Sequence, residues 1–152
     1  MGQWSRFLAE EAGFDPHYQL MAHFSGLLHD IGKIEISVDV LNKSRLDEGE
    51  YEKMQDHATA SAKLLDPLIK DPFFREVQLN VLHHHERIDG NGYPLGVPGL
   101  KIPLISKVIL IVDTVDAMTS DRPYRKGLPI EVAYRELERC SGTQFDLSLI
   151  HI

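Results

Sequence analysis

The sequence has 152 residues, of which 43% are hydrophobic and 26% are charged, and its formal net charge is -7. This composition is typical of one globular domain and excludes collagen-like, coiled-coil and long disordered chains. The longest uncharged apolar run covers residues 108–112, far short of the roughly 20 residues that a membrane helix requires. The acidic balance disfavours a broad contact with duplex nucleic acid.

The N-terminal residues and the cysteine content indicate the compartment. Residues 1–13 include charged side chains and lack the apolar stretch of a signal peptide. Cys140 is the only cysteine, so no internal disulfide can form. We therefore expect a single domain over residues 1–152 in the reducing cytoplasm.

Two Asp-Pro pairs, at residues 15–16 and 71–72, mark helix starts, because aspartate caps a helix whose first position tolerates the missing N–H of proline. The first pair predicts a helix from Asp15 to a stop at Gly32. Along it, apolar residues keep helical spacing at Leu20, Met21, Phe24, Leu27 and Leu28. The second pair predicts a helix over residues 72–84.

Between these helices, Asp47 and Glu50 have the spacing of a capping box and predict a helix over residues 47–65. Glycine and proline then crowd into residues 90–99, so we expect a shaped loop after His85. Neither segment shows the alternating pattern of a half-buried strand.

The stretch 102–118 is ambiguous, because its apolar run at residues 108–112 also suits a buried strand. Across the wider stretch, the apolar residues keep helical spacing at Ile105, Val108, Ile109, Val112 and Val115. We expect a buried helix here, an amphipathic helix over residues 131–140 with Pro129 near its start, and a final helix capped by Asp146. The predicted fold class is all-α.

Histidine and aspartate gather in four segments. His29 and Asp30 follow an apolar helix, His57 lies on the next long helix, and residues 83–85 end the helix after that. Asp113 follows the most apolar run, where an unpaired carboxylate would be costly. Imidazole and carboxylate ligands without thiolate suit Fe, Mn or Zn in a catalytic site, and one carboxylate can bridge two metals in hydrolytic sites. The pattern therefore indicates phosphoester hydrolysis.

Each signal also has a structural interpretation. Single histidines such as His17, His23 and His151 are more often ordinary surface or partly buried residues, so we exclude them from the site. Three consecutive histidines can simply end a helix, where its dipole favours them. Asp113 can pair with Lys107. The coincidence of all four segments favours the metal site.

Taken in order, these segments resemble the motifs of the HD-GYP domain, a branch of the HD metal-dependent phosphohydrolases. The matching segments are residues 29–33 (His-Asp-Ile-Gly-Lys), His57, residues 84–94 (ending Gly-Tyr-Pro) and residues 113–125. The resemblance extends from about Phe7 to Asp146 and implies a helical bundle around a buried centre of two or three divalent ions, with Fe or Mn favoured over Zn. Family members hydrolyse cyclic di-GMP to the linear dinucleotide, some continue to GMP, and a few act on related cyclic dinucleotides.

The resemblance also implies residue roles. The metal-ligand positions are His29, Asp30, His57, His84, His85 and Asp113. Asp30 would bridge the metals, and Lys33 would steady the charge that develops on the scissile phosphate. The substrate-binding positions are Lys33, Tyr93, Pro94, Arg122 and Arg125. As structural alternatives, Gly92-Tyr93-Pro94 is an ordinary turn and the two arginines pair with Asp121.

The match fails at the two ends of the chain. The family has a further metal-ligating histidine on an upstream helix, whereas His17 falls in the connection after that helix, and the final helix is short at Ile152. We therefore expect a fragment whose exposed core surface would favour a homodimer, joined in the intact protein to sensory or receiver domains.

Three functions remain open. The first is a cyclic dinucleotide phosphodiesterase. The second is a signalling module that binds a cyclic dinucleotide or a partner domain without cleavage, which the missing ligand motivates. The third keeps the chemistry but acts on another nucleotide or a phosphate monoester.

Overall fold

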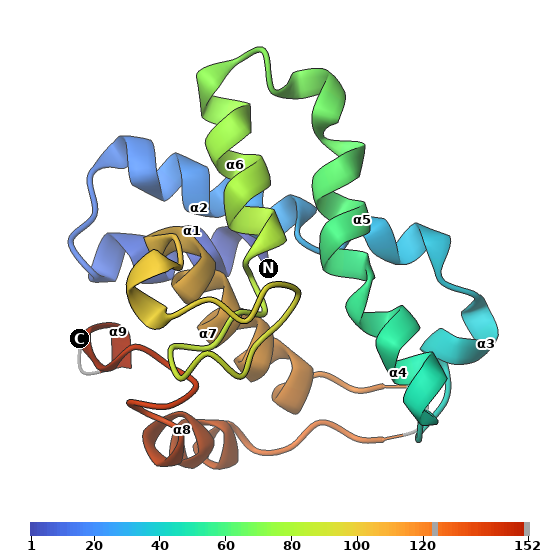
Figure 1. The fold of residues 1–152 in the computed structure, drawn as a ribbon. Coiled ribbons are helices and arrows are strands. Elements are labelled where there is room, and N and C mark those ends of the chain that lie inside the picture. Colours follow the sequence, from blue (N-terminus) through green and yellow to red (C-terminus); the bar gives the residue numbers. More distant parts are fainter. Residues whose placement is uncertain (123–124, 151–152) are drawn as a thin grey trace.

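The computed structural model describes residues 1–122 and 125–150, and these residues form helices and loops without a strand. The α-helices are α1 (Gly2–Glu11), α2 (Pro16–Leu28), α3 (Val38–Leu41), α4 (Glu48–Gln55), α5 (His57–Leu64), α6 (Pro72–Leu82), α7 (Leu104–Thr119), α8 (Ile130–Arg139) and α9 (Leu147–Ile150). The short 3-10 helices are η1 (Ile31–Glu35), η2 (Asp66–Leu68) and η3 (Gly99–Lys101). Figure 1 shows α1 packed beside α2 and α5 beside α6. The predicted all-α fold is confirmed.

Helix α7 is the centre of the packing. Residues 105–112 of this helix are almost entirely buried. One side packs through Ile105 and Ile109 into a core with α1, α2 and α6. The other side packs through Val108 and Ile111 against α8 and α9. The predicted buried helix is confirmed, and its continuous apolar run follows from burial on two sides.

Helix α1 is the element that the apolar pattern did not predict. Its buried face consists of the small residues Gly2, Ser5 and Ala9, and the helix packs on α2. The two helices approach so closely that a Cβ on Gly26 of α2 would overlap Ser5. Because the large apolar residues of α1 lie away from this contact, a search for a stripe of large residues misses the helix.

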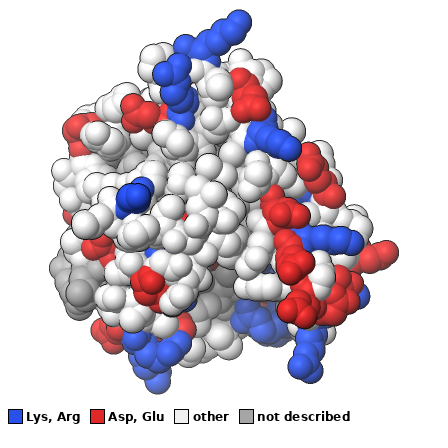
Figure 2. Space-filling model, in the orientation of Figure 1, with Lys and Arg blue, Asp and Glu red and all other residues white. Residues whose placement is uncertain are grey.

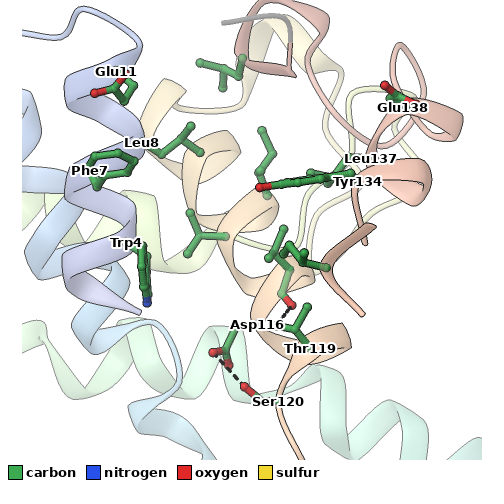
Figure 3. Close-up of a pocket in the computed structure, with 15 residues that line it drawn as sticks. Trp4, Phe7, Leu8, Glu11, Asp116, Thr119, Ser120, Tyr134, Leu137 and Glu138 are labelled. Atoms are coloured by element: carbon green, nitrogen blue, oxygen red, sulfur yellow. Dashed lines mark hydrogen bonds between the residues drawn. The ribbon is translucent and has the colours of Figure 1, made fainter. Parts of the chain in front are cut away.

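Those large residues line a groove of about 970 Å³ between α1, α7 and α8. Figure 3 shows Trp4 and Phe7 of α1 on one side of the groove and Tyr134 of α8 on the other. All three side chains are more than half exposed. None of the predicted metal ligands lines this groove, so the cavity lies apart from the predicted chemistry.

The predicted helix starts are confirmed by their capping contacts. Asp15 and Asp71 accept hydrogen bonds from backbone N–H groups at the starts of α2 and α6. Asp47 and Glu50 form the capping box of α4. Asp146 accepts from the second backbone N–H that follows it, at the start of α9.

Two predicted helix boundaries are wrong. Helix α2 ends at Leu28, short of the predicted stop, because the chain turns into η1 and brings Gly32 against α5. There the Gly32 N–H donates to Ser61 Oγ over 2.8 Å. The helix predicted over residues 47–65 is broken at Asp56 into α4 and α5. These breaks place His29, Asp30 and His57 at helix ends.

Charged side chains are unevenly distributed over the face shown in Figure 2, where acidic residues gather over α3 and α4. Asp39, Glu48 and Glu50 belong to the first turns of these helices. An anionic ligand near this region would depend on local cations. Within the described residues, no helix is long and apolar enough to cross a bilayer.

We expect Gly32→Ala to destabilise the protein. An added Cβ would overlap the His57 carbonyl and the Ser61 backbone, which cannot rotate away, so the free energy of unfolding should fall by about 1–3 kcal/mol. Urea unfolding followed by circular dichroism measures this change.

Gly49→Ala is the matched control. Gly49 is exposed in α4, where a Cβ would meet only the Asp47 carboxylate at 3.7 Å, so this substitution should raise the free energy of unfolding by about 0.5–1 kcal/mol. Equal stability of the two variants would contradict the close packing of η1 on α5.

Candidate metal centre

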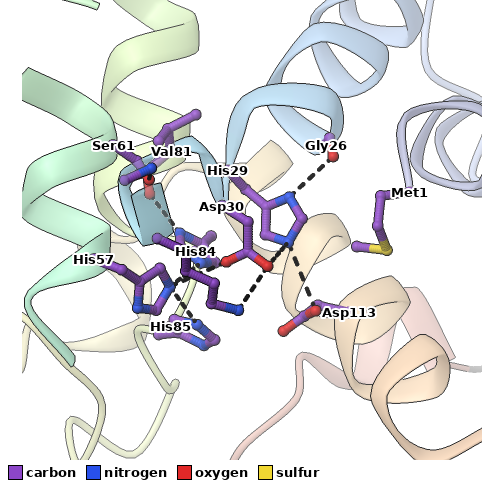
Figure 4. Close-up of polar contacts among 12 residues, drawn as sticks. Met1, Gly26, His29, Asp30, His57, Ser61, Val81, His84, His85 and Asp113 are labelled. Atoms are coloured by element: carbon purple, nitrogen blue, oxygen red, sulfur yellow. Dashed lines mark hydrogen bonds and ion pairs between the residues drawn. The ribbon is translucent and has the colours of Figure 1, made fainter. Parts of the chain in front are cut away.

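Segments that are distant in the sequence meet in one cluster at helix ends (Figure 4). The Nε2 atom of His57 lies 3.2 Å from the Nε2 atoms of both His84 and His85. The Oδ1 atom of Asp30 lies 3.3 Å from the same His57 nitrogen. One ligand atom from each of the three histidines lies within 4.8 Å of the others, which is a spacing that could hold a metal ion.

A second group adjoins the first. The Oδ2 atom of Asp30 lies 3.3 Å from His29 Nε2, and ligand atoms of His29, Asp30 and His84 also lie within 4.8 Å of one another. Asp113, on α7, places Oδ1 at 3.6 Å from His29 Nε2. Asp30 thus faces one histidine with each carboxylate oxygen, and His84 belongs to both groups. All six predicted ligand positions meet in this cluster.

Backbone carbonyls fix the tautomers of three histidines. The Nδ1 atoms of His29, His57 and His84 lie 3.0, 2.6 and 2.6 Å from carbonyl oxygens three residues earlier, which belong to Gly26, Met54 and Val81. A carbonyl oxygen only accepts, so each Nδ1 must carry a proton and donate it. In each neutral ring, Nε2 then presents an unprotonated lone pair to the cluster.

Among the described residues, acceptors of the cluster face one another or have no donor. Because neutral His57 and His84 both present Nε2 as an acceptor, their 3.2 Å contact places two acceptors face to face. The buried Asp30 Oδ1 atom has no hydrogen-bond partner among the described residues. Unsatisfied buried acceptors are costly, and a shared cation would satisfy several of them at once. The donor set of imidazole nitrogen and carboxylate oxygen therefore fits divalent transition metal ions.

Burial keeps three of the rings neutral. It lowers the pKa of His85 to about 4 and also lowers the pKa of His57 and the pKa of His84. The histidine neighbours of His84 lower its pKa further, because adjacent positive charges repel. All three imidazoles are therefore in the form that binds metal at pH 7.

His29 is the exception. Burial alone would lower its pKa, but the facing carboxylates of Asp113 and Asp30 outweigh burial and raise the pKa of His29 to about 9. Burial would raise the pKa of each carboxyl group, yet the same pairing with His29 lowers both. In the metal-free protein, the Nε2 proton of His29 lies between the carboxylates of Asp30 and Asp113, at the place where a cation would bind. A metal ion must therefore displace this proton.

Lys33 lies beside the cluster on η1. Its Nζ atom donates to Asp30 Oδ2 over 2.6 Å, and both side chains are about one-third exposed. The contact holds an ammonium group next to the carboxylate that faces both histidine groups. An anion that approaches from solvent can therefore reach this ammonium.

Tyr93 and Pro94 lie in the glycine-rich loop beside the cluster. The Tyr93 ring stacks on the His85 ring, with centroids 4.6 Å apart and planes at 29°. The Tyr93 N–H donates to the His85 carbonyl over 3.2 Å, and the bond between Tyr93 and Pro94 is cis. The predicted loop thus contacts the cluster through Tyr93.

Glu86 positions this loop, a role that the sequence reasoning missed. Its buried carboxylate accepts from the backbone N–H groups of Leu95, Gly96 and Val97 at 2.7, 3.1 and 3.1 Å. The bonds fix the loop directly beside the cluster. The sequence position of Glu86 gave a hint of this role. Glu86 follows His84 and His85 directly and precedes the glycine-rich loop, whose backbone N–H groups need acceptors.

Arg122 and Arg125 pair through an isolated β-bridge after α7. The Arg125 guanidinium donates to the carbonyl oxygens of Ala117 and Met118 over 2.6 and 3.3 Å. It thereby satisfies the Ala117 carbonyl at the end of α7, and the Met118 carbonyl also accepts from the Leu128 N–H over 2.8 Å. Among the described residues, no hydrogen bond or ion pair joins either arginine to the cluster, and their contact with phosphate stays a prediction.

The histidines excluded from the site have other surroundings. The His17 ring packs edge to face on Phe73, with centroids 5.7 Å apart, and His23 packs in the same way on Phe24 at 5.5 Å. Both belong to the aromatic packing around α2. His151 lies outside the described residues.

Comparison with known proteins identifies relatives of this chain. The chain is similar to the "Cyclic di-GMP phosphodiesterase" of Thermotoga maritima, with 36% identity over 99% of this chain and 41% of that protein. It is similar to the "3'3'-cGAMP-specific phosphodiesterase 1" of Vibrio cholerae, with 39% identity over 81% of this chain and 28% of that protein. The chain therefore spans less than half the length of these relatives.

A solved structure shares the fold. The HD-GYP-type protein Bd1817 from Bdellovibrio bacteriovorus superposes with a TM-score of 0.76 at 18% identity, covering 99% of this chain and 49% of that chain. At this identity the likeness shows the fold alone. The family model of the HD domain matches residues 1–149. The resemblance to HD-GYP proteins is confirmed, and the chain belongs to the HD domain family.

Proposed function

We propose that the protein hydrolyses a phosphodiester bond of cyclic di-GMP to give the linear dinucleotide, using two or three divalent metal ions. The main support for this proposal is the position of Asp30. Its Oδ1 atom lies 3.3 Å from His57 Nε2, and its Oδ2 atom lies 3.3 Å from His29 Nε2. A carboxylate between two histidine groups is suited to bridge two ions.

The residues of the cluster divide into two candidate ligand groups. One consists of His57, His84 and His85, and the other of His29, Asp30 and His84, with Asp113 beside His29. When bound, divalent ions supply a water of lowered pKa and neutralise charge on the phosphoryl group. The Nδ1 bonds to backbone carbonyls hold the rings in the orientation that this binding needs.

Lys33 acts on the substrate in this proposal. Its ammonium lies 2.6 Å from Asp30 and one-third exposed, so it can contact a non-bridging oxygen of the scissile phosphate. Asp30 keeps the ammonium in place, and Lys33 stabilises the negative charge that develops on that oxygen. Tyr93, stacked on His85, forms the adjoining wall of the substrate site.

The names of the relatives support the substrate class. They include phosphodiesterases named for cyclic di-GMP and for 3'3'-cGAMP, so both compounds belong in the assay. Regulation by sensory or receiver domains, dimerisation and a cytoplasmic location remain predictions from the sequence.

His84→Ala should abolish activity, because this side chain belongs to both ligand groups. We expect the metal content to fall and cyclic di-GMP hydrolysis to drop by at least about 100-fold, since loss even of a residue that supports a ligand costs about 10- to 100-fold. Elemental analysis and product chromatography measure the two effects, and circular dichroism checks the fold.

His83→Ala is the matched control one residue away. The Nδ1 atom of His83 bonds to the Leu79 carbonyl, and His83 belongs to neither ligand group. This variant should keep its metal and its activity. Full activity in the His84 variant would contradict the proposal, whereas tight binding of cyclic di-GMP by wild-type protein without turnover would favour the binding module.

Lys33→Met should separate catalysis from metal binding. We expect turnover to fall about 100-fold while the metal content is retained, because the variant loses charge stabilisation but no ligand. Lys43→Met provides a control, since Lys43 pairs with Glu50 on the surface of α4. If Lys33→Met turned over substrate at the wild-type rate, the assigned role of Lys33 would be wrong.

Metal removal should lower stability, because the metal-free cluster holds unsatisfied acceptors. Mn²⁺ at about 100 times its Kd should add roughly 2.7 kcal/mol to the free energy of unfolding. Thermal unfolding with chelator and with added Mn²⁺ tests this, and identical midpoints would argue against a metal site.

A further inference from the structure

A second cavity, of about 440 Å³, opens beside the metal centre. It shares two residues with the centre, His85 and its stacked neighbour Tyr93. A substrate whose phosphate lies at Lys33 would thus have a cavity next to it across the His85 ring. The size is sufficient for a nucleobase with part of its ribose.

The walls of the cavity combine aromatic rings with amide groups. Tyr51 and Gln55 come from α4, Tyr93 from the glycine-rich loop, and Gln144 from the turn before α9. The Tyr51 side chain is 54% exposed, so its ring is accessible to a ligand. An aromatic face stacks on a base, and an amide can donate to and accept from the edge of a base.

Hydrogen bonds within the protein hold the loop wall of the cavity in place. Arg87 donates to both oxygens of Asp89, at 3.0 and 2.6 Å, and to Gln144 Oε1 at 2.9 Å. The Asp89 N–H donates to the Thr143 carbonyl over 2.9 Å. Together with the bonds that Glu86 makes, these contacts tie the loop to the turn before α9, so binding need not order it.

The charge of the cavity favours a neutral group over a phosphate. Among the described lining residues, Arg87 is the one charged side chain, since burial keeps His85 neutral, and the Arg87 guanidinium is paired with Asp89. The ammonium of Lys33 lies instead with the metal cluster, where it is paired with Asp30. Phosphate and base therefore have separate places that differ in charge.

We propose that this cavity binds one guanine base of the cyclic dinucleotide, with the Tyr51 ring as the stacking surface and the Gln55 amide at the base edge. The inference rests on the proposed function and extends it, because it assigns recognition of the base to residues outside the metal centre.

Tyr51→Ala tests the proposal. Loss of one stacking contact should raise KM for cyclic di-GMP about 10-fold with kcat and metal content unchanged. Hydrolysis of bis(p-nitrophenyl) phosphate, which carries no nucleobase, should stay within about twofold of wild type. Tyr51→Phe should restore KM, because stacking needs the ring and not the hydroxyl. Gln55→Ala should raise KM less than Tyr51→Ala does.

Tyr134→Ala is the matched control, since Tyr134 is 57% exposed but lies in the groove between α1 and α8. Calorimetry with cyclic di-GMP gives the same comparison through Kd if turnover is absent. An unchanged KM or Kd in Tyr51→Ala would contradict base binding in this cavity and would leave the proposed phosphodiesterase activity unaffected. If wild-type protein hydrolyses neither substrate, the proposed activity is wrong. The Kd of Tyr51→Ala for cyclic di-GMP, compared with the Kd of wild type, then still tests whether the cavity binds a base.

Discussion

The bond from histidine Nδ1 to a backbone carbonyl three residues earlier is the constraint on which the cluster depends. It recurs at His29, His57 and His84, and each time Nδ1 donates its proton to the carbonyl and Nε2 is directed into the cluster. Carbonyls near helix ends are free to accept such bonds. The helix breaks after Leu28 and at Asp56 therefore matter for chemistry, because they place the histidines at such ends.

This arrangement couples the stability of the fold to its ligand. The Nε2 lone pairs of His57 and His84 face one another across 3.2 Å and repel in the metal-free protein. At His29 there is no such repulsion, because its Nε2 atom takes up a proton between two carboxylates. Cations that replace this proton and satisfy the lone pairs stabilise the folded state. The repulsion within the metal-free cluster is thus a physical reason to expect bound metal, and this reason does not depend on similarity to other proteins.

The sequence predicts those parts of the fold whose causes are local. The caps at Asp15 and Asp71 and the buried helix α7 follow from neighbouring residues, whereas the candidate ligand set comes from the resemblance to the HD-GYP motifs. What it does not predict depends on contacts between distant segments. Helix α2 stops early because Gly32 must approach α5. Helix α1 is held by small buried residues, whose role is evident only when the helix that packs on them is known. The position of Glu86 before the glycine-rich loop is compatible with a loop acceptor, but which N–H groups it binds depends on the folded loop.

The two cavities beside α7 have opposite characters, and the difference limits what each can bind. The groove between α1 and α8 is mostly apolar and shares no residue with the cluster, whereas the cavity at Tyr51 is smaller, more polar and adjoins His85. A phosphate needs compensating charge, which this acidic chain offers at Lys33 and at cations bound by the cluster. A base needs a ring face and an amide, which α4 offers. Because the proposed base contacts lie on α4 and Lys33 lies on η1, recognition of the base and cleavage of the phosphate can be altered separately.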